Sequence, residues 1–387
     1  MNDLFWLILV LFFVAAALRS ELFFYLLYMV VGLQALVRFW LWRGTKQLNW
    51  RRRMPLAAFP GEQTTIELEL ENQGLLPLPW VTVTDSTPPS LRNPPTIREV
   101  LSLAAGERRV LTYSVSAQRR GYYRMGPLMV QTGDVLGLDE RMLSKPETEA
   151  LTIYPPTLTL AELGLPAKLP YGTLAAQQRL FSDPARPTGV RPYQPADSVR
   201  RIDWKSTARS GSPQVRRHQP AIALETLIAL AFSRDEYDSR FVYDTIERAL
   251  TAAASLAAHL VAQRQPIGLC TSGRDPAIGA RALSVPIGHG RAHLMTIMGT
   301  LGRLELAAQG DLVAQLRETA HLGWGSTLVL VTGQRGPALV ARLLPLQRRG
   351  LSLVLIISEP TPAELGLPRE YGIATFGLWR DGRPARA

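Results

Sequence analysis

The chain has 387 residues, 47% of them hydrophobic, with 43 basic and 32 acidic side chains and a formal net charge of +11. This length suggests two or three domains, and the apolar fraction excludes a disordered chain, since disordered chains carry too few apolar residues to form a core. The single cysteine excludes a disulfide framework, a cysteine-ligated zinc ribbon and an iron–sulfur cluster, because each needs several sulfur atoms. The positive charge is compatible with nucleic acid, anionic lipid or an acidic protein as a partner.

The first 42 residues are the most apolar part of the chain. Residues 4–18 form an uninterrupted apolar run, and residues 22–42 form a second run that Gln34 and Arg38 interrupt. A spanning helix needs about 20 apolar residues. We therefore expect a transmembrane helical hairpin over residues 1–45, in contact with the lipid bilayer through residues 4–42. A single anchor left after cleavage of a signal peptide and a soluble hydrophobic hairpin are the alternatives.

A basic flank without acidic residues follows the second apolar run. It contains Arg38, Arg43, Lys46, Arg51, Arg52 and Arg53. Basic flanks stay on the cytoplasmic side of a membrane. We therefore expect a multi-pass protein of the cell membrane, with both termini and the soluble domains in the cytoplasm.

Residues 46–156 have the pattern of an all-β domain. Residues 65–71 alternate strictly between polar and apolar side chains, and residues 80–84 do so less regularly. Further strands are expected at residues 109–116, 127–132 and 150–154, with turn residues between them. Several short strands at this spacing predict a β-sandwich of the immunoglobulin-like kind, which usually serves as a spacer or a binding surface.

Strands and helices alternate in the last part of the chain. We expect residues 157–220 to be a linker with a basic loop and residues 221–387 to be an α/β domain. Expected strands are 221–232, 267–271, 327–332 and 351–358, and expected helices are 241–263, 292–303, 311–320 and 337–349. This order predicts a doubly wound parallel sheet with helices on both faces.

The basic loop, residues 186–220, contains eight basic and two acidic residues, with Tyr193 and Trp204 among them. One interpretation is an exposed surface that docks an acidic partner, phosphate or nucleic acid. The other is an internal network in which Asp197 and Asp203 pair with Arg200, Arg201 or Arg209. Aspartates within basic runs usually form ion pairs, which favours the second interpretation.

The same stretch resembles the signature of a bacterial membrane-anchored family catalogued as domain of unknown function 58. That signature runs Arg-x-Tyr-x-Pro-Gly-Asp, then Arg-x-Ile-Asp-Trp-Lys, then Ala-Arg. The matching residues are Arg191, Tyr193, Pro195, Asp197, Arg201, Ile202, Asp203, Trp204, Lys205, Ala208 and Arg209, with Ala196 in place of the usual glycine. Residues 119–127 and 134–138 resemble upstream motifs of the family, so the resemblance covers about residues 1–300.

The resemblance implies an α/β domain similar to von Willebrand factor type A domains and a partnership with MoxR-type AAA+ ATPases. It also implies a role as an accessory or scaffold protein. The residues expected to carry the signature and to dock a partner are Arg191, Tyr193, Asp197, Arg200, Arg201, Asp203, Trp204, Lys205 and Arg209.

Type A domains often hold magnesium through Asp-x-Ser-x-Ser after the first strand and Thr-Asp-Gly after a later one. This chain has Ser-Arg-Asp-Glu at residues 233–236 and Thr-Gly-Gln at residues 332–334, so the oxygen ligands fall short. We expect no metal and no cofactor. Asp235, Glu236 and Asp238 are predicted to cap the following helix.

No catalytic motif stands out. Cys270 lies in an expected buried strand, and His289 and His293 lack a third zinc ligand. There is no Walker A sequence, Gly-x-Ser-x-Gly or His-Glu-x-x-His. The sequence therefore predicts a non-enzymatic scaffold that binds protein rather than nucleic acid. The alternatives are a hydrolase acting on envelope material and a binder of nucleic acid or anionic lipid.

Overall fold

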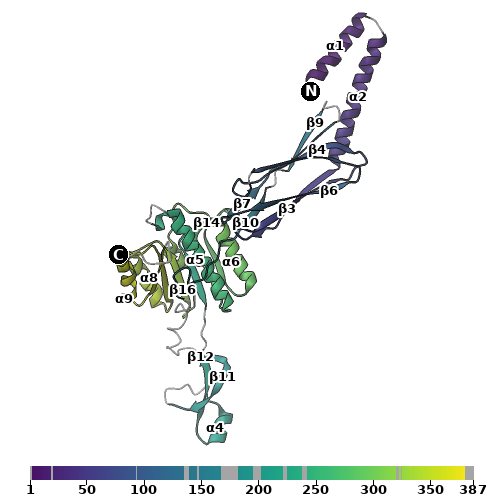
Figure 1. The fold of residues 1–387 in the computed structure, drawn as a ribbon. Helices are drawn as coiled ribbons and strands as arrows, with labels where there is room; N and C mark the ends of the chain where they lie inside the picture. Colours follow the sequence, from purple (N-terminus) through teal and green to yellow (C-terminus); the bar gives the residue numbers. More distant parts are fainter. Residues whose placement is uncertain are drawn as a thin grey trace. The chain divides into compact units, whose positions relative to one another are not determined.

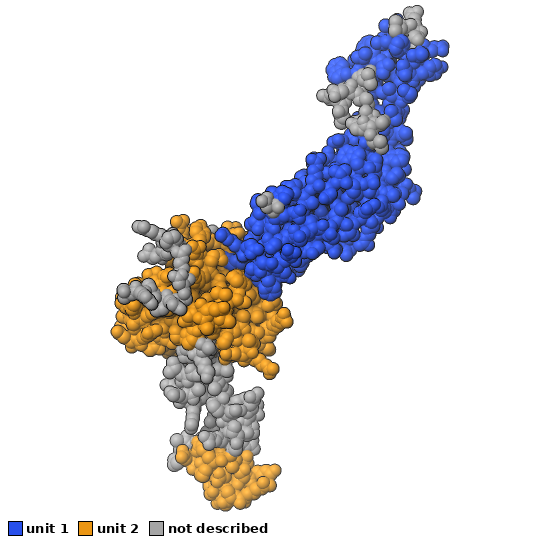
Figure 2. Space-filling model, in the orientation of Figure 1, with its two compact units in different colours: residues 1–154 blue, residues 155–387 orange. Residues whose placement is uncertain are grey.

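The computed structural model describes residues 2–18, 21–92, 94–134, 139–145, 148–166, 182–194, 202–220, 225–237, 242–319, 322–323 and 325–379. The chain divides into two compact units, residues 1–154 and residues 155–387 (Figures 1 and 2). Unit 1 contains apolar helices followed by strands, and strands alternate with helices in unit 2. The predicted multidomain organisation, with an apolar N-terminal helix, then strands and later helices, is confirmed.

Two apolar helices begin unit 1: α1 (Asn2–Leu18) and α2 (Glu21–Lys46), which pack against each other. Helix α2 is long and apolar enough to cross a membrane, and little of it is buried against protein, which confirms the expected membrane-helix candidate. The 17 residues of α1 extend about 25 Å, less than a hydrocarbon layer of about 30 Å. The structure therefore supports one spanning helix, whereas the predicted hairpin needs two.

Short strands make up the rest of unit 1, which we term the β module (residues 48–153). They are β1 (Leu48–Arg53), β2 (Ala57–Ala58), β3 (Gln63–Asn72), β4 (Leu78–Ser86), β5 (Thr96–Leu103), β6 (Arg108–Ser116), β7 (Gly121–Met125), β8 (Leu128–Gly133), β9 (Glu140–Lys145) and β10 (Glu149–Ile153). They form sheets of order β1-β3-β6, β2-β10-β7 and β5-β4-β8-β9, in which every pair is antiparallel except β2 with β10. The expected strands correspond to β3, β4, β6, β8 and β10.

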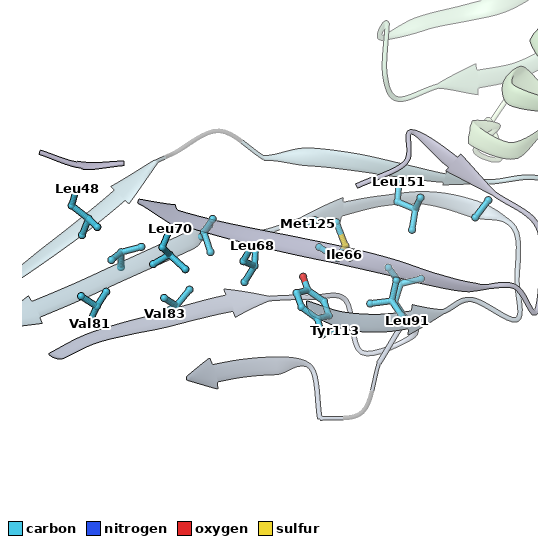
Figure 3. Packing of buried hydrophobic residues seen from close by; sticks show 14 of the residues in the cluster. Leu48, Ile66, Leu68, Leu70, Val81, Val83, Leu91, Tyr113, Met125 and Leu151 are labelled. Carbon is cyan, nitrogen blue, oxygen red and sulfur yellow. The ribbon is translucent and has the colours of Figure 1, made fainter. Parts of the chain in front are cut away.

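Alternating apolar residues of these strands form the core of the β module. Ile66, Leu68 and Leu70 of β3 are almost fully buried, and they belong to one cluster with Val81 and Val83 of β4 (Figure 3). Since successive side chains of a strand point to opposite faces, the period-two pattern of residues 65–71 places these three side chains on the same face. Burial of such apolar surface is the main stabilising contribution to the module.

Three of the arginines in the basic flank belong to β1 and contact acidic residues of the β module. The Arg52 guanidinium forms a bidentate ion pair with Asp85, and both side chains are buried. Arg51 and Arg53 contact Glu69, at 2.8 and 2.9 Å between nitrogen and carboxylate oxygen. Acidic residues distant in sequence therefore neutralise three of the cations in a flank that contains no acidic residue of its own.

Unit 2 is built on a six-stranded sheet. Its elements are β13 (Thr226–Leu230), a 3₁₀ turn η2 (Arg234–Glu236), α5 (Val242–Ala262), β14 (Ile267–Asp275), β15 (Ala280–Gly288), α6 (Arg291–Arg303), α7 (Leu312–Thr319), β16 (Thr327–Thr332), α8 (Pro337–Arg348), β17 (Ser352–Ser358), α9 (Pro362–Glu370) and β18 (Ala374–Leu378). The order is β15-β14-β13-β16-β17-β18, and all pairs are parallel except β14 with β15. Helix α5 packs on β13, β14 and β16, and α7 packs on β14, β15 and α8.

The central strands of this sheet are buried along their whole length, and apart from terminal threonines they are apolar. All five residues of β13 and all six of β16 are buried. Continuous apolar runs of this kind are typical of parallel strands that are covered on both faces. This is why residues 327–332 and 351–358 were identifiable as strands, whereas β15 and β18 at the sheet edges were not.

The basic loop contains regular structure, so its prediction as a loop is wrong. It includes most of β11 (Ser182–Pro192), helix α4 (Trp204–Ser210) and β12 (Gln214–Pro220). Strands β11 and β12 pair antiparallel as a two-stranded sheet. The many proline and arginine residues of this stretch concealed the strand pattern, because proline within a run argues against a strand.

Candidate functional site

Helix α4 begins at a well-formed cap. The carboxylate of Asp203 accepts a hydrogen bond from the backbone N–H of Ser206 at 3.1 Å. Gly211 ends the helix in the left-handed conformation, with φ of 69°. An aspartate before the first turn and a glycine after the last one are the residue types that these two positions favour. The sequence Asp-Trp-Lys-Ser-Thr-Ala-Arg-Ser-Gly therefore specifies a short helix of two turns.

The inner side of α4 is fastened to β12. The Thr207 hydroxyl accepts a hydrogen bond from the Gln214 backbone N–H at 3.0 Å, and the Asp203 N–H donates to the Gln214 carbonyl at 2.8 Å. Val215 is 2% exposed and forms a β-bridge with Ile202. These contacts fix the orientation of the helix relative to the strand pair.

The outer side of α4 presents an aromatic and basic surface, which we term the α4 face: Trp204, Lys205, Ala208 and Arg209. All four residues are exposed, and the Trp204 side chain is 68% exposed. Residues four apart on a helix are neighbours, so Trp204 lies beside Ala208 and Lys205 beside Arg209. An exposed tryptophan flanked by cations is the composition of a protein-binding surface.

Of the remaining predicted residues, the structure describes Arg191, Tyr193 and Asp203. Arg191 is the next-to-last residue of β11 and its side chain is half-buried, and the Tyr193 N–H donates to the Pro213 carbonyl at 2.9 Å. Asp197, Arg200 and Arg201 lie outside the described residues. Asp203 has a role that the sequence did not predict, because its carboxylate caps α4.

A second candidate site lies at the carboxyl ends of the central strands of unit 2. Strand β13 pairs with β14 on one side and β16 on the other, so the connections that leave β13 and β16 diverge here. Ligands of open α/β sheets bind at such switch points. A cleft of about 550 Å³ lies at this edge, lined by Asp235, Glu236, Gly333, Gln334, Arg335, Gly336, Ala338, Leu339, Arg342 and Glu364.

One of the residues that line this cleft, Glu236, has a buried carboxylate. Glu236 is 3% exposed and accepts hydrogen bonds from the hydroxyls of Ser233 and Ser272 and from the Leu312 N–H at 3.1 Å. Burial raises the pKa of Glu236, although these hydrogen bonds act in the opposite direction. Asp235 accepts from the Gly310 N–H. In the described part of the chain, both acids therefore accept hydrogen bonds from backbone N–H groups at or just before the start of α7. Asp238 and residues 239–241, which precede α5, lie outside the described residues, so the capping of α5 stays a prediction.

Ion pairs form the rim of the cleft. Arg335 contacts Glu364 at 3.5 Å, and Arg342 pairs with Asp311. Burial acts to raise the pKa of Asp311, but the Ala314 N–H and Arg342 outweigh it and hold that pKa below its usual value. Arg335 and Arg342 were not identified from the sequence. The local signal for Arg335 is a glycine-flanked turn after a buried strand, and Arg342 lies within α8.

The residues considered for catalysis belong to different elements: Cys270 to β14, His289 to the connection after β15 and His293 to α6. Cys270 is buried in β14 and has 1% of its surface exposed. The Nε2 atom of the His293 ring lies 2.8 Å from the carbonyl oxygen of Ile267, the first residue of β14. The His289 side chain is exposed. Within the described ranges, no three His, Cys, Asp or Glu side chains are grouped to hold a metal ion.

Comparison with known proteins shows that the α4 face lies within a region that a family model matches. The family model described as "Protein of unknown function DUF58" matches residues 189–358, which extend from β11 to the end of β17. The match includes the α4 face and most of the α/β sheet, and it does not extend over unit 1, where the resemblance was also expected.

Two bacterial proteins are similar to this chain over about half of its length. The chain is similar to "Uncharacterized protein YeaD" of Bacillus subtilis (strain 168), with 24% identity over 228 residues, 58% of this chain and 53% of the relative. It is similar to "Uncharacterized protein Rv1480" of Mycobacterium tuberculosis (strain ATCC 25618 / H37Rv), with 26% identity over 171 residues, 44% of this chain and 46% of the relative. The chain thus spans about half the length of the curated relatives that it matches.

Among solved structures, the chain is similar to the CARDB domain of the PF1109 protein from Pyrococcus furiosus, a complex with di-metal ions. The TM-score is 0.21 at 18% identity, over 27% of this chain and 91% of that chain. Beta-glucosidase from Listeria innocua is similar over 27% of this chain and 16% of that one, with a TM-score of 0.18 and 16% identity.

Proposed function

We propose that this chain is a membrane-anchored, non-enzymatic scaffold that docks an acidic protein surface through the α4 face. The observation that carries the proposal is the combination of Trp204, Lys205 and Arg209 on the exposed side of a helix whose other side is fastened to β12. Asp203 is the only acidic residue between positions 202 and 220, and its carboxylate caps the helix. The surface therefore keeps a positive character.

The docked partner in this proposal is a MoxR-type AAA+ ATPase, as the family resemblance implies. A rigid aromatic side chain supplies contact area, and the flanking cations steer an acidic surface toward it. The α/β unit that carries the face is proposed to be similar to type A domains. The strand order and the antiparallel edge strand β15 support that similarity.

Anchoring to the cell membrane is proposed to occur through α2 as the spanning helix, with α1 inserted beside it as the shorter helix of the predicted hairpin and the soluble units in the cytoplasm. Arg43 and Lys46 in the last turn of α2 support this orientation, because they are the cations closest to the end of the membrane helix. Arg51, Arg52 and Arg53 give it less support than the sequence suggested, since acidic residues of the β module neutralise them. In chain order, the β module lies between the membrane helix and the α4 face.

The test is a binding titration between the full-length chain in lipid nanodiscs and the MoxR-type ATPase of the same genome. Trp204→Ala should weaken binding at least about tenfold, the loss typical of an interface hot spot. The pair Lys205→Glu and Arg209→Glu should weaken it further and lower its dependence on salt. Arg98→Glu with Arg291→Glu is the matched control, because both arginines are exposed and the change in net charge is the same.

The outcomes separate the proposal from its alternatives. Equal loss in the control pair would mean that only net charge matters, and unchanged binding by Trp204→Ala would refute docking through the α4 face. Binding of the wild-type chain to DNA or RNA with a steep salt slope would instead support a nucleic-acid binder. A topology reporter at the C-terminus that is active only outside the cytoplasm would overturn the proposed orientation.

A further inference from the structure

The end of the membrane helix is joined directly to one loop of the β module. The Trp40 indole N–H donates to the Pro77 carbonyl at 3.0 Å. Leu41 is fully buried, and Gly44 approaches Leu78 so closely that an added Cβ would lie 2.8 Å from Leu78 Cδ2. The loop between β3 and β4, residues 73–77, is therefore attached to the last two turns of α2 without a flexible linker.

Helix geometry gives the depth at which this attachment lies. A hydrocarbon layer about 30 Å thick takes about 20 residues at 1.5 Å each. If the layer begins at Leu22, the first apolar residue of α2, it ends near Leu41. Trp40 is then at the boundary between hydrocarbon and headgroups, where tryptophan is favoured. Because Trp40 holds Pro77, the loop lies at the same level.

The loop presents an apolar side chain to its surroundings. Leu75 is 89% exposed, the most exposed large apolar side chain in the described residues. Its neighbour Leu76 is half-buried, and Pro77 is exposed. We propose that residues 74–77 insert into the lipid interface beside α2 and that Leu75 is a second membrane contact of the chain. This inference rests on the proposed membrane anchoring by α2.

An equally exposed leucine at the far end of the module provides the contrast. Leu56 is 84% exposed, and it follows β1, which begins at Leu48 opposite Asn72. The six residues of β1 extend about 20 Å from the helix end. Exposure alone therefore does not distinguish Leu75 from Leu56, whereas distance from the end of α2 does.

The experiment uses the full-length chain with its buried Cys270 replaced by serine, reconstituted in vesicles of phosphatidylcholine and phosphatidylglycerol. A single cysteine at position 31, 56 or 75 carries an environment-sensitive fluorophore. Nitroxide lipids with the quencher near the headgroup or deep in the acyl chain report depth. Position 31 should lose emission with the deep quencher, position 75 with the shallow quencher, and position 56 with neither.

Each outcome has a distinct meaning. No quenching at position 31 would refute the membrane anchoring itself. Quenching at position 31 without shallow quenching at position 75, or equal quenching at positions 56 and 75, would overturn only the interfacial insertion. As a second measurement, Leu75→Asp should abolish shallow quenching of a fluorophore at position 73, whereas Leu56→Asp should leave it unchanged.

Discussion

Replacing Arg52 by methionine should destabilise the β module more than any other single change in the basic flank. Arg52 donates through Nε to Asp85 Oδ2 at 3.0 Å and through Nη2 to Asp85 Oδ1, while the Tyr113 hydroxyl donates to the same carboxylate at 2.6 Å. The side chains of Arg52 and Asp85 are 2% and 0% exposed. Burial acts to lower the pKa of Arg52, but its bond to Asp85 outweighs this and raises that pKa.

The size of the effect follows from the charge that remains. In Arg52→Met, Asp85 is left buried with Tyr113 as its side-chain donor, and breaking a buried ion pair from one side costs about 3–5 kcal/mol. Arg51→Met is the control, because Arg51 is 56% exposed and Glu69 keeps Arg53 and Arg108. Loss of an exposed pair costs at most about 1 kcal/mol.

Amide hydrogen exchange of the full-length chain in nanodiscs measures the difference. Peptides from β3 and β4 should lose about two to three and a half orders of magnitude of protection in Arg52→Met and less than one in Arg51→Met. The double variant Arg52→Met with Asp85→Leu should recover most of the loss, since it removes both charges. Equal effects of the two single variants, or no recovery in the double variant, would refute the reasoning.

Three further changes test unit 2. The Glu236→Gln variant should become more stable relative to wild type as pH rises above about 4.5. Because the pKa of Glu236 is raised in the folded chain, the folded chain holds a proton that the unfolded chain has already released. The free energy of unfolding of the wild type therefore falls as pH rises through the folded-state pKa, whereas that of the variant lacks this pH dependence. Thermal unfolding at several pH values checks this, and a difference that does not vary with pH would contradict it. Asp203→Ala should destabilise α4 by about 1 kcal/mol through loss of its cap, and Asp203→Asn much less, as hydrogen exchange of residues 204–211 would show. Gly333→Ala should destabilise the sheet edge by about 1–3 kcal/mol, because its Cβ would lie 2.3 Å from Tyr237 Cδ1. Gly323→Ala should be tolerated, because the nearest atom to its Cβ would be Ser326 Oγ at 3.8 Å, an ordinary contact distance; similar melting temperatures for the two variants would refute this.

The elements predicted best are those whose pattern is local and continuous. Residues 241–263 and 292–303 correspond closely to α5 and α6, and residues 327–332 are β16 itself. The two edge strands of the six-stranded sheet, β15 and β18, were not predicted, because neither has a continuous apolar run. The candidate site was partly predicted: Trp204, Lys205 and Arg209 were identified from the signature, but their common exposure depends on a helix that the proline- and arginine-rich sequence concealed.

Sequence alone determined the apolar length of α2, the alternation of β3 and the buried strands of the parallel sheet, because each depends on neighbours within about 20 residues. Only the tertiary structure decided which of the charges in an excess of +11 are neutralised. Arg52 meets Asp85 across 33 positions, and Glu236 meets the Leu312 N–H across 76. The strength of an ion pair depends on distance and burial, and folding sets both between residues far apart in the chain. The part of the charge that remains exposed on α4 is therefore a property of the fold.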